Sequence, residues 1–163
     1  MTMLRVVDSI TELGTQDAGC LAVSGSHGGI SSARYALAAR PRLSVFNDAG
    51  VGKDEAGLAA LPFLQSHGLA ACTVAHSSAR IGEAQSTLDE GVVSHVNALA
   101  QALGVSVGEP CEILISRLKG CAGQEVGAAQ SAAAKLVSDP NNSGDSRGAE
   151  CPVRLIRQTT SAA

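Results

Sequence analysis

Three apolar runs of the chain are each followed by a polar segment that is bordered by glycine. These segments are residues 24–29 (SGSHGG), 47–52 (NDAGVG) and 76–82 (HSSARIG). Imidazole and carboxylate groups transfer protons near neutral pH, and a guanidinium group binds carboxylate or phosphate. If the fold brings the three segments together, they form a site for acid/base chemistry on a small anionic molecule.

His27 is the first candidate for proton transfer, because it stands beside glycines at the end of an apolar run. Asp48 is the candidate to orient His27 or to act as a base itself, and Asn47 is an alternative orienting group. Ser78 is the candidate nucleophile. Each residue also has a structural explanation: His27 bonds its own turn, while Asp48 and Ser78 cap the helices that follow them.

Backbone N–H groups at the glycines are predicted to bind the anion, because glycine permits close approach and a helix start favours negative charge. Arg80 adds a permanent cation. The predicted ligand-binding residues are Ser26, Gly28, Gly29, Asn47, Gly50, Gly52, Ser77 and Arg80. Alternatively, the glycines only make tight turns, and Arg80 pairs with Glu83 at the surface.

A metal site is the weaker interpretation of the same segments. His27, Asp48 and His76 are ligand types that suit zinc or iron. No local spacing joins them, because each comes from a different segment. We therefore predict neither a metal nor a cofactor.

Known phosphate-binding and hydrolase motifs are incomplete in these segments. Residues 47–54 end like a P-loop at Lys53, but Asn47 replaces the first glycine and Asp54 replaces the Ser or Thr. Gly50 and Gly52 begin like a dinucleotide-binding motif, but the third glycine, Gly57, comes two residues late. A nucleophile elbow around Ser26 fails because Ser24 stands where that motif needs glycine. The sequence therefore indicates a place for a site without identifying a reaction.

The elements that must position these segments follow from the apolar pattern. Strands are predicted at residues 4–7, 20–24, 43–46 and 69–75. Helices are predicted at residues 30–39, from about residue 53 until Pro62 kinks or ends the helix, and at residues 86–103. In the last of these, Ser86 and Asp89 resemble a capping box, and apolar residues recur at helical spacing up to Gly104.

The final third of the chain is less regular. A helix is predicted from Pro110, with residues 113–115 as an alternative strand. Residues 124–137 are rich in alanine and predicted helical, and residues 138–150 are predicted to form a mobile loop. Residues 153–156 are predicted to form a final strand, either at an edge of this sheet or on a neighbouring subunit. The predicted organisation is one α/β domain over residues 1–137, followed by the loop and C-terminal segment at 138–163.

The order of strand, glycine-containing turn and helix repeats at intervals of about thirty residues or fewer, which is typical of a parallel sheet. The predicted fold is therefore a three-layer, Rossmann-like α/β domain with a mainly parallel sheet. Such sheets bind ligands at the carboxyl ends of their strands. Because those ends share one edge, the three polar segments are expected to converge.

Composition limits the classes of function. The chain has 163 residues and a net charge of −3, and only 2% of its residues are aromatic, which argues against a nucleic-acid binder. Its five cysteines are an odd number without a C-x-x-C pair. No membrane span or signal peptide is evident, so we expect a cytoplasmic protein. The many small residues predict a core that is completed in a homo-oligomer.

The function predicted from these observations is an enzyme, of the hydrolase, lyase or isomerase type, that acts on a small anionic metabolite. One alternative is a metabolite-binding or regulatory module that uses the same pocket without chemistry. Another is a structural subunit of an assembly, for which the alanine-rich helices argue. Catalysis requires a histidine with a hydrogen-bonded partner in a concave pocket, whereas binding requires only Arg80 and backbone amides.

Overall fold

A computed structural model describes residues 2–120 of the chain, and a five-stranded sheet forms its centre. The strands lie in the order β1-β2-β3-β4-β5, so each strand pairs with its predecessor in the sequence. Strands β1 to β4 are parallel, and β5 is antiparallel to β4. The strands are β1 (Leu4–Val7), β2 (Leu21–His27), β3 (Leu43–Asn47), β4 (Ala70–Val74) and β5 (Val93–Val96). The predicted α/β fold with a mainly parallel sheet is confirmed.

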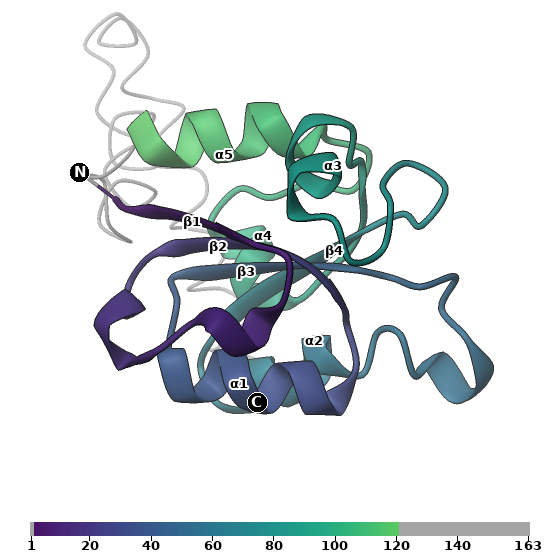
Figure 1. The fold of residues 1–163 in the computed structure, drawn as a ribbon, viewed down its shortest axis with the longest axis horizontal. Coiled ribbons are helices and arrows are strands. Elements are labelled where there is room, and N and C mark those ends of the chain that lie inside the picture. Colours follow the sequence, from purple (N-terminus) through teal and green to yellow (C-terminus); the bar gives the residue numbers. More distant parts are fainter. Residues whose placement is uncertain (1, 121–163) are drawn as a thin grey trace, which may run out of the picture. The chain divides into compact units, whose positions relative to one another are not determined.

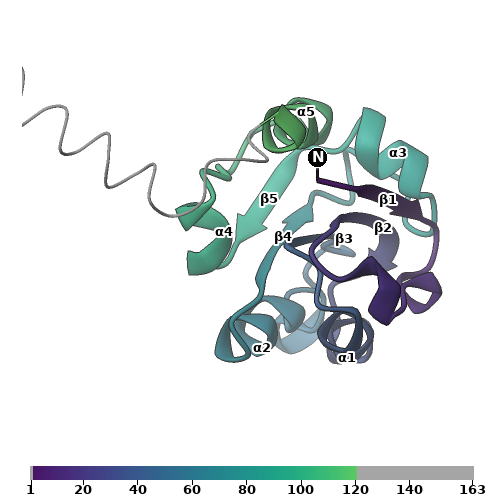
Figure 2. The same ribbon diagram turned by 90° about the vertical axis from the view of Figure 1, so that its left-hand side faces the viewer.

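Helices cover both faces of this sheet and make three layers (Figures 1 and 2). Helices α1 and α2 lie on one face, and α3 and α5 lie on the other. Because the strand order rises without a reversal, α1 and α2 follow one another on the same face. The helices are α1 (Ile30–Ala39), α2 (Ala60–Ser66), α3 (Ala84–Asp89), α4 (Ala98–Ala102) and α5 (Cys111–Gly120).

Alternating residues of the central strands build two separate cores. In β3, Val45 belongs to the cluster that includes Leu114 of α5, whereas Phe46 belongs to the cluster that includes Leu64 of α2. All residues of β3 and β4 are buried. A strand that is covered on both faces needs apolar residues at nearly every position, which explains the uninterrupted apolar runs in the sequence.

The predicted helix at residues 30–39 is confirmed as α1. Its alanines Ala33, Ala36 and Ala39 are fully buried, so this helix lies close against the sheet. It ends at Arg40, which adopts a left-handed conformation with φ of 53°, one residue before Pro41. Proline has no N–H group with which to continue a helix, which gives the stop a physical cause.

The long helix predicted at residues 86–103 is wrong. The structure has α3, then β5, then α4 over this stretch. Gly91 allows the change of direction, because a Cβ atom there would collide with the carbonyl oxygen of Thr87. The β-branched Val93 and Val96 then pair with β4, as strand residues do. The apolar residues that recur at helical spacing are thus distributed over three shorter elements.

Helix boundaries were predicted at Pro62 and at Pro110, and the two predictions have different outcomes. Pro62 neither kinks nor ends α2, because it lies in the first turn, where its missing N–H would have no partner in the helix. The helix predicted from residue 53 is only a 3₁₀ turn, Lys53–Glu55, that precedes α2. After Pro110 the predicted helix is confirmed as α5.

The features predicted for residues 124–137, 138–150 and 153–156 lie outside the described residues.

The cysteines Cys20, Cys72 and Cys111 are buried and free. Burial raises the pKa of the Cys20 thiol to about 11 and that of Cys111 to about 12. Neither thiol therefore supplies a nucleophilic thiolate at neutral pH. Over residues 2–120, every helix is too short or too polar to cross a bilayer.

The loop before α3 is held against β2 at Gly25. The N–H of Gly82 donates to the carbonyl of Gly25 at 2.7 Å, and a Cβ atom on Gly25 would lie 2.5 Å from the backbone of Gly82 and Glu83. We expect Gly25→Ala to lower the free energy of unfolding by about 1–3 kcal/mol, through overpacking. Urea unfolding measures this change. Gly120→Ala is the control, because a Cβ atom there meets nothing within 4 Å. Equal effects of the two substitutions would contradict the close approach at Gly25.

Candidate functional site

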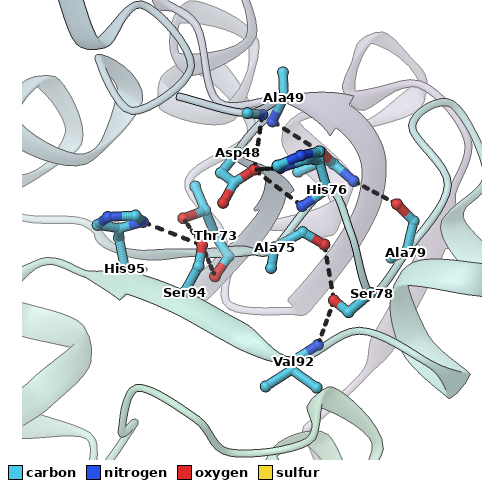
Figure 3. A network of polar contacts seen from close by, with 12 residues as sticks. Asp48, Ala49, Thr73, Ala75, His76, Ser78, Ala79, Val92, Ser94 and His95 are labelled. Carbon is cyan, nitrogen blue, oxygen red and sulfur yellow. Dashed lines mark hydrogen bonds and ion pairs between the residues drawn. The ribbon is translucent and has the colours of Figure 1, made fainter. Parts of the chain in front are cut away.

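The site is organised by Asp48, the residue that directly follows β3. Strands β3 and β4 are parallel neighbours, so the loops after them start at the same edge of the sheet. The N–H of Asp48 donates to the carbonyl of Val74 at 2.9 Å, which anchors one loop to the end of the other strand. This places Asp48 beside His76 (Figure 3). The predicted convergence of the second and third polar segments is therefore observed.

Asp48 and His76 form a hydrogen-bonded pair. Oδ1 of Asp48 lies 3.1 Å from Nδ1 of His76, and it also accepts from the backbone N–H of His76 and of Gly50, each at 2.9 Å. The Asp48 side chain is 6% exposed, whereas that of His76 is 60% exposed. Because an ionised carboxylate only accepts, Nδ1 of His76 carries the proton. Nε2 is then the ring nitrogen that remains for chemistry.

Asp48 is held in its ionised form. Burial of the carboxyl group raises its pKa, but hydrogen bonds from the N–H groups of Gly50 and His76, from the Ser94 hydroxyl and from the His76 ring outweigh that effect. The net pKa lies below the usual value for Asp. At neutral pH the ring of His76 therefore faces a full negative charge, and the hydrogen bond to it fixes the orientation of the ring.

A second group of polar side chains supports the carboxylate from β4 and β5. Oγ of Ser94 lies 3.0 Å from Oγ1 of Thr73 and 3.1 Å from Nδ1 of His95. In Figure 3, these side chains lie below Asp48, on the side away from His76. Ser94 is the member of this group that contributes to the lowered pKa of the Asp48 carboxyl. Sequence reasoning missed Ser94, because residues 86–103 were predicted to be helical.

His76 opens onto a hollow of about 920 Å³ beside the end of β4. Open α/β sheets bind ligands in a crevice at the point where the strand order reverses. The strand order here has no reversal, and the hollow is instead bounded by the loop between β4 and α3. Its charged members are Arg80, Glu83 and Glu90. The lining residues are Asn47, Ala49, His76, Ser77, Ser78, Ala79, Arg80, Ile81, Glu83 and Glu90.

His27 lies in a different hollow. This second hollow, of about 430 Å³, shares only Ala49 with the first. The His27 ring lies against Gly29, where an added Cβ atom would be 2.8 Å from Nε2. Asp48 is bonded to His76, and Asn47 donates to the carbonyl of Ala79 at 3.0 Å. The structure therefore gives His27 neither of the orienting partners that the sequence predicted.

Several glycine amides predicted to face a ligand are already bonded to other groups of the chain. The N–H of Gly28 donates to the carbonyl of Asn47, that of Gly50 to the Asp48 carboxylate, and that of Gly52 to the carbonyl of Gly50. Gly50 and Gly52 both have φ of +71°, a conformation that favours glycine. The alternative explanation of tight turns therefore applies to Gly50 and Gly52, whereas the Gly28 amide bonds across to the end of β3.

Two predicted serines also have internal partners. Oγ of Ser78 donates to the carbonyl of Ala75 at 2.8 Å and accepts from the N–H of Val92 at 2.9 Å. The first contact lies within the loop after β4 and the second ties this loop to the segment that enters β5, which favours a structural role over a nucleophilic one. Oγ of Ser26 accepts from the N–H of Ile10 at 3.0 Å and thus faces the loop after β1.

The other two residues predicted in the third segment line the large hollow. Ser77 and Arg80 are both part of its wall. The Arg80 side chain is 76% exposed and lies 3.5 Å from Glu83, which is the surface pair that the sequence offered as an alternative. An ion pair this exposed contributes little to stability, so the guanidinium is available to a ligand.

The three residues of the metal interpretation are not assembled as a set of ligands. His76 bonds directly to Asp48, and His27 lines the second hollow. Within residues 2–120, no three His, Cys, Asp or Glu side chains are grouped in a way that would hold a metal ion.

The lowered pKa of Asp48 predicts a pH-dependent effect of Asp48→Asn. Because the folded-state pKa lies below the unfolded one, the carboxylate stabilises the protein above the unfolded value, and this stabilisation is lost as the pH falls through the folded value. We expect a loss of about 1–3 kcal/mol near pH 7 that shrinks below about pH 4. Urea unfolding over a pH series measures it.

Asp89→Asn provides the matched control, because Asp89 is an exposed carboxylate in α3 whose only hydrogen-bond partner among residues 2–120 is Gln85. Its effect should be small across the same series. A loss in Asp48→Asn that stays constant down to acid pH would show that the carboxylate charge is not what stabilises the loops.

The chain was compared with protein-family models, with curated proteins and with solved structures, and none of them matched it. A function can therefore only be argued from the geometry of Asp48, His76 and the hollow beside them.

Proposed function

We propose that this chain is an enzyme that acts on a small anionic metabolite by general acid/base catalysis, with His76 as the proton-transfer group. The observation that carries the proposal is the hydrogen bond of 3.1 Å from Nδ1 of the exposed His76 ring to the buried Asp48 carboxylate. A buried carboxylate that holds one ring nitrogen fixes the tautomer and leaves the other nitrogen to exchange protons.

In the proposed reaction, Nε2 of His76 takes a proton from the substrate, or from a water molecule that attacks it. The ring then becomes positive, and the Asp48 carboxylate stabilises that charge through Nδ1–H. The same proton is returned to the product or to the leaving group, so the enzyme is unchanged after one turnover. Proton transfer of this kind contributes about 10²–10⁴ to the rate.

Arg80 is the proposed partner of the substrate anion. It lines the same hollow as His76, and its planar guanidinium group suits carboxylate or phosphate. In a hydrolytic reaction, water would be the nucleophile, since both hydrogen-bonding functions of the Ser78 hydroxyl are engaged with backbone groups. This part of the proposal replaces the His27 and Ser78 roles suggested by sequence alone.

Cytoplasmic location and self-association stay predictions. The buried free thiols of Cys20, Cys72 and Cys111 suit a reducing compartment. Exposed apolar side chains such as Tyr35 and Ile113 are consistent with contact between copies of the chain.

The proposal is tested by turnover of a panel of small carboxylates, carboxamides and phosphate esters in deuterated water, followed by proton NMR. Deuterium entering a C–H position reports proton abstraction, and new resonances report cleavage or isomerisation. We expect wild-type protein to convert at least one member, and His76→Gln to slow that conversion by about 10²–10⁴.

His67→Gln is the control, because His67 ends α2 and bonds the carbonyl of Phe63, outside the hollow. Its turnover should equal that of the wild type. Loss of turnover in His27→Gln with full activity in His76→Gln would refute the assignment. Binding of a panel member that depends on Arg80, without any turnover, would favour the metabolite-binding module.

A further inference from the structure

The charges around the large hollow do not suit a simple anion. Arg80 supplies one positive charge to its wall, while Glu83 and Glu90 supply two negative ones. Glu83 already lies 3.5 Å from the guanidinium of Arg80 and compensates it in part. These three side chains together carry a net negative charge, so a molecule that carries only negative charge would gain little there.

The carboxylate of Glu90 is held in the hollow by a defined set of contacts. Oε2 of Glu90 accepts from the hydroxyl of Ser86 at 2.7 Å, and Oγ of Ser86 accepts from the backbone N–H of Arg80 at 3.0 Å. Ser86 itself is buried. One buried hydroxyl group thus connects the backbone of the cationic residue with the anionic side chain, and it fixes both on the wall of one hollow.

This arrangement leaves a hydrogen-bond acceptor on the wall of the hollow that His76 also lines. Only Oε2 of Glu90 is engaged within the described residues, which leaves Oε1 for a ligand. A carboxylate oxygen in this position binds a group that both carries positive charge and donates hydrogen bonds, such as an ammonium group. Arg80 offers the opposite preference within the same hollow.

We propose that the ligand of this hollow is a zwitterion, with a carboxylate or phosphate that binds Arg80 and an ammonium group that binds Glu90. The inference rests on the proposed function and narrows its substrate class from small anions to amino-acid-like molecules. His76 would then exchange protons with the part of the molecule that lies between the two charged ends.

Three probes of similar size distinguish the possibilities: β-alanine carries both charges, propionate only the negative one and propylamine only the positive one. Binding is measured from the shifts of the backbone amide resonances of residues 76–83 in ¹⁵N-labelled protein. We expect β-alanine to bind about tenfold more tightly than either singly charged probe, as one additional charge-assisted hydrogen bond provides.

Glu90→Gln should abolish the advantage of β-alanine over propionate and leave propionate binding unchanged or stronger. Glu112→Gln is the matched control, because it removes the same charge from the exposed first turn of α5, outside the hollow. In this control the preference for β-alanine should persist.

Equal binding of propionate and β-alanine, or a preference that survives Glu90→Gln, would overturn the zwitterion while leaving the anion-binding enzyme intact. Failure of all three probes to shift these resonances would also overturn it. The role of His76 is decided separately, by the turnover of His76→Gln.

Discussion

A buried negative charge governs the geometry of this edge of the sheet. An ionised carboxylate with 6% exposure is strongly unfavourable unless donors surround it. Asp48 obtains its donors from two loops: the N–H of Gly50 from its own, and the N–H and ring of His76 from the loop after β4. Satisfying one charge therefore fixes two loops relative to each other, and the orientation of the histidine is a result of that requirement.

The same requirement accounts for the unusual backbone after β3. Ala49, Gly50, Val51 and Gly52 all have positive φ, and at Val51, which is β-branched, φ is 66°. Such a residue costs about 1–3 kcal/mol and persists only where its surroundings impose it. Here the N–H of Val51 donates to the carbonyl of Asp48 at 2.7 Å, and its own carbonyl accepts from Gly57. Hydrogen bonds from the N–H of Val51 and to its carbonyl therefore hold this strained residue on both sides.

The sequence predicted most of the sheet but only part of the site. Apolar runs identify β3 and β4 because both faces of a central strand are covered, and Pro41 locates the end of α1. The meeting of Asp48 with the loop after β4 follows from parallel neighbours. The choice of His76 over His27 does not follow, because it depends on loop conformation and on a register shift in β2 between Val23 and His27. Periodicity also failed at β5, where strand and helix patterns coincide.

The sequential order of the strands bears on how the protein is assembled during translation. Each strand that leaves the ribosome finds its partner already present, so the parallel part of the sheet can grow vectorially from the N-terminus. Asp48 and His76 are both synthesised before β5, which brings Ser94 beneath the carboxylate. The surroundings of Asp48 are thus completed only after β5, the only antiparallel strand among residues 2–120, has paired with β4.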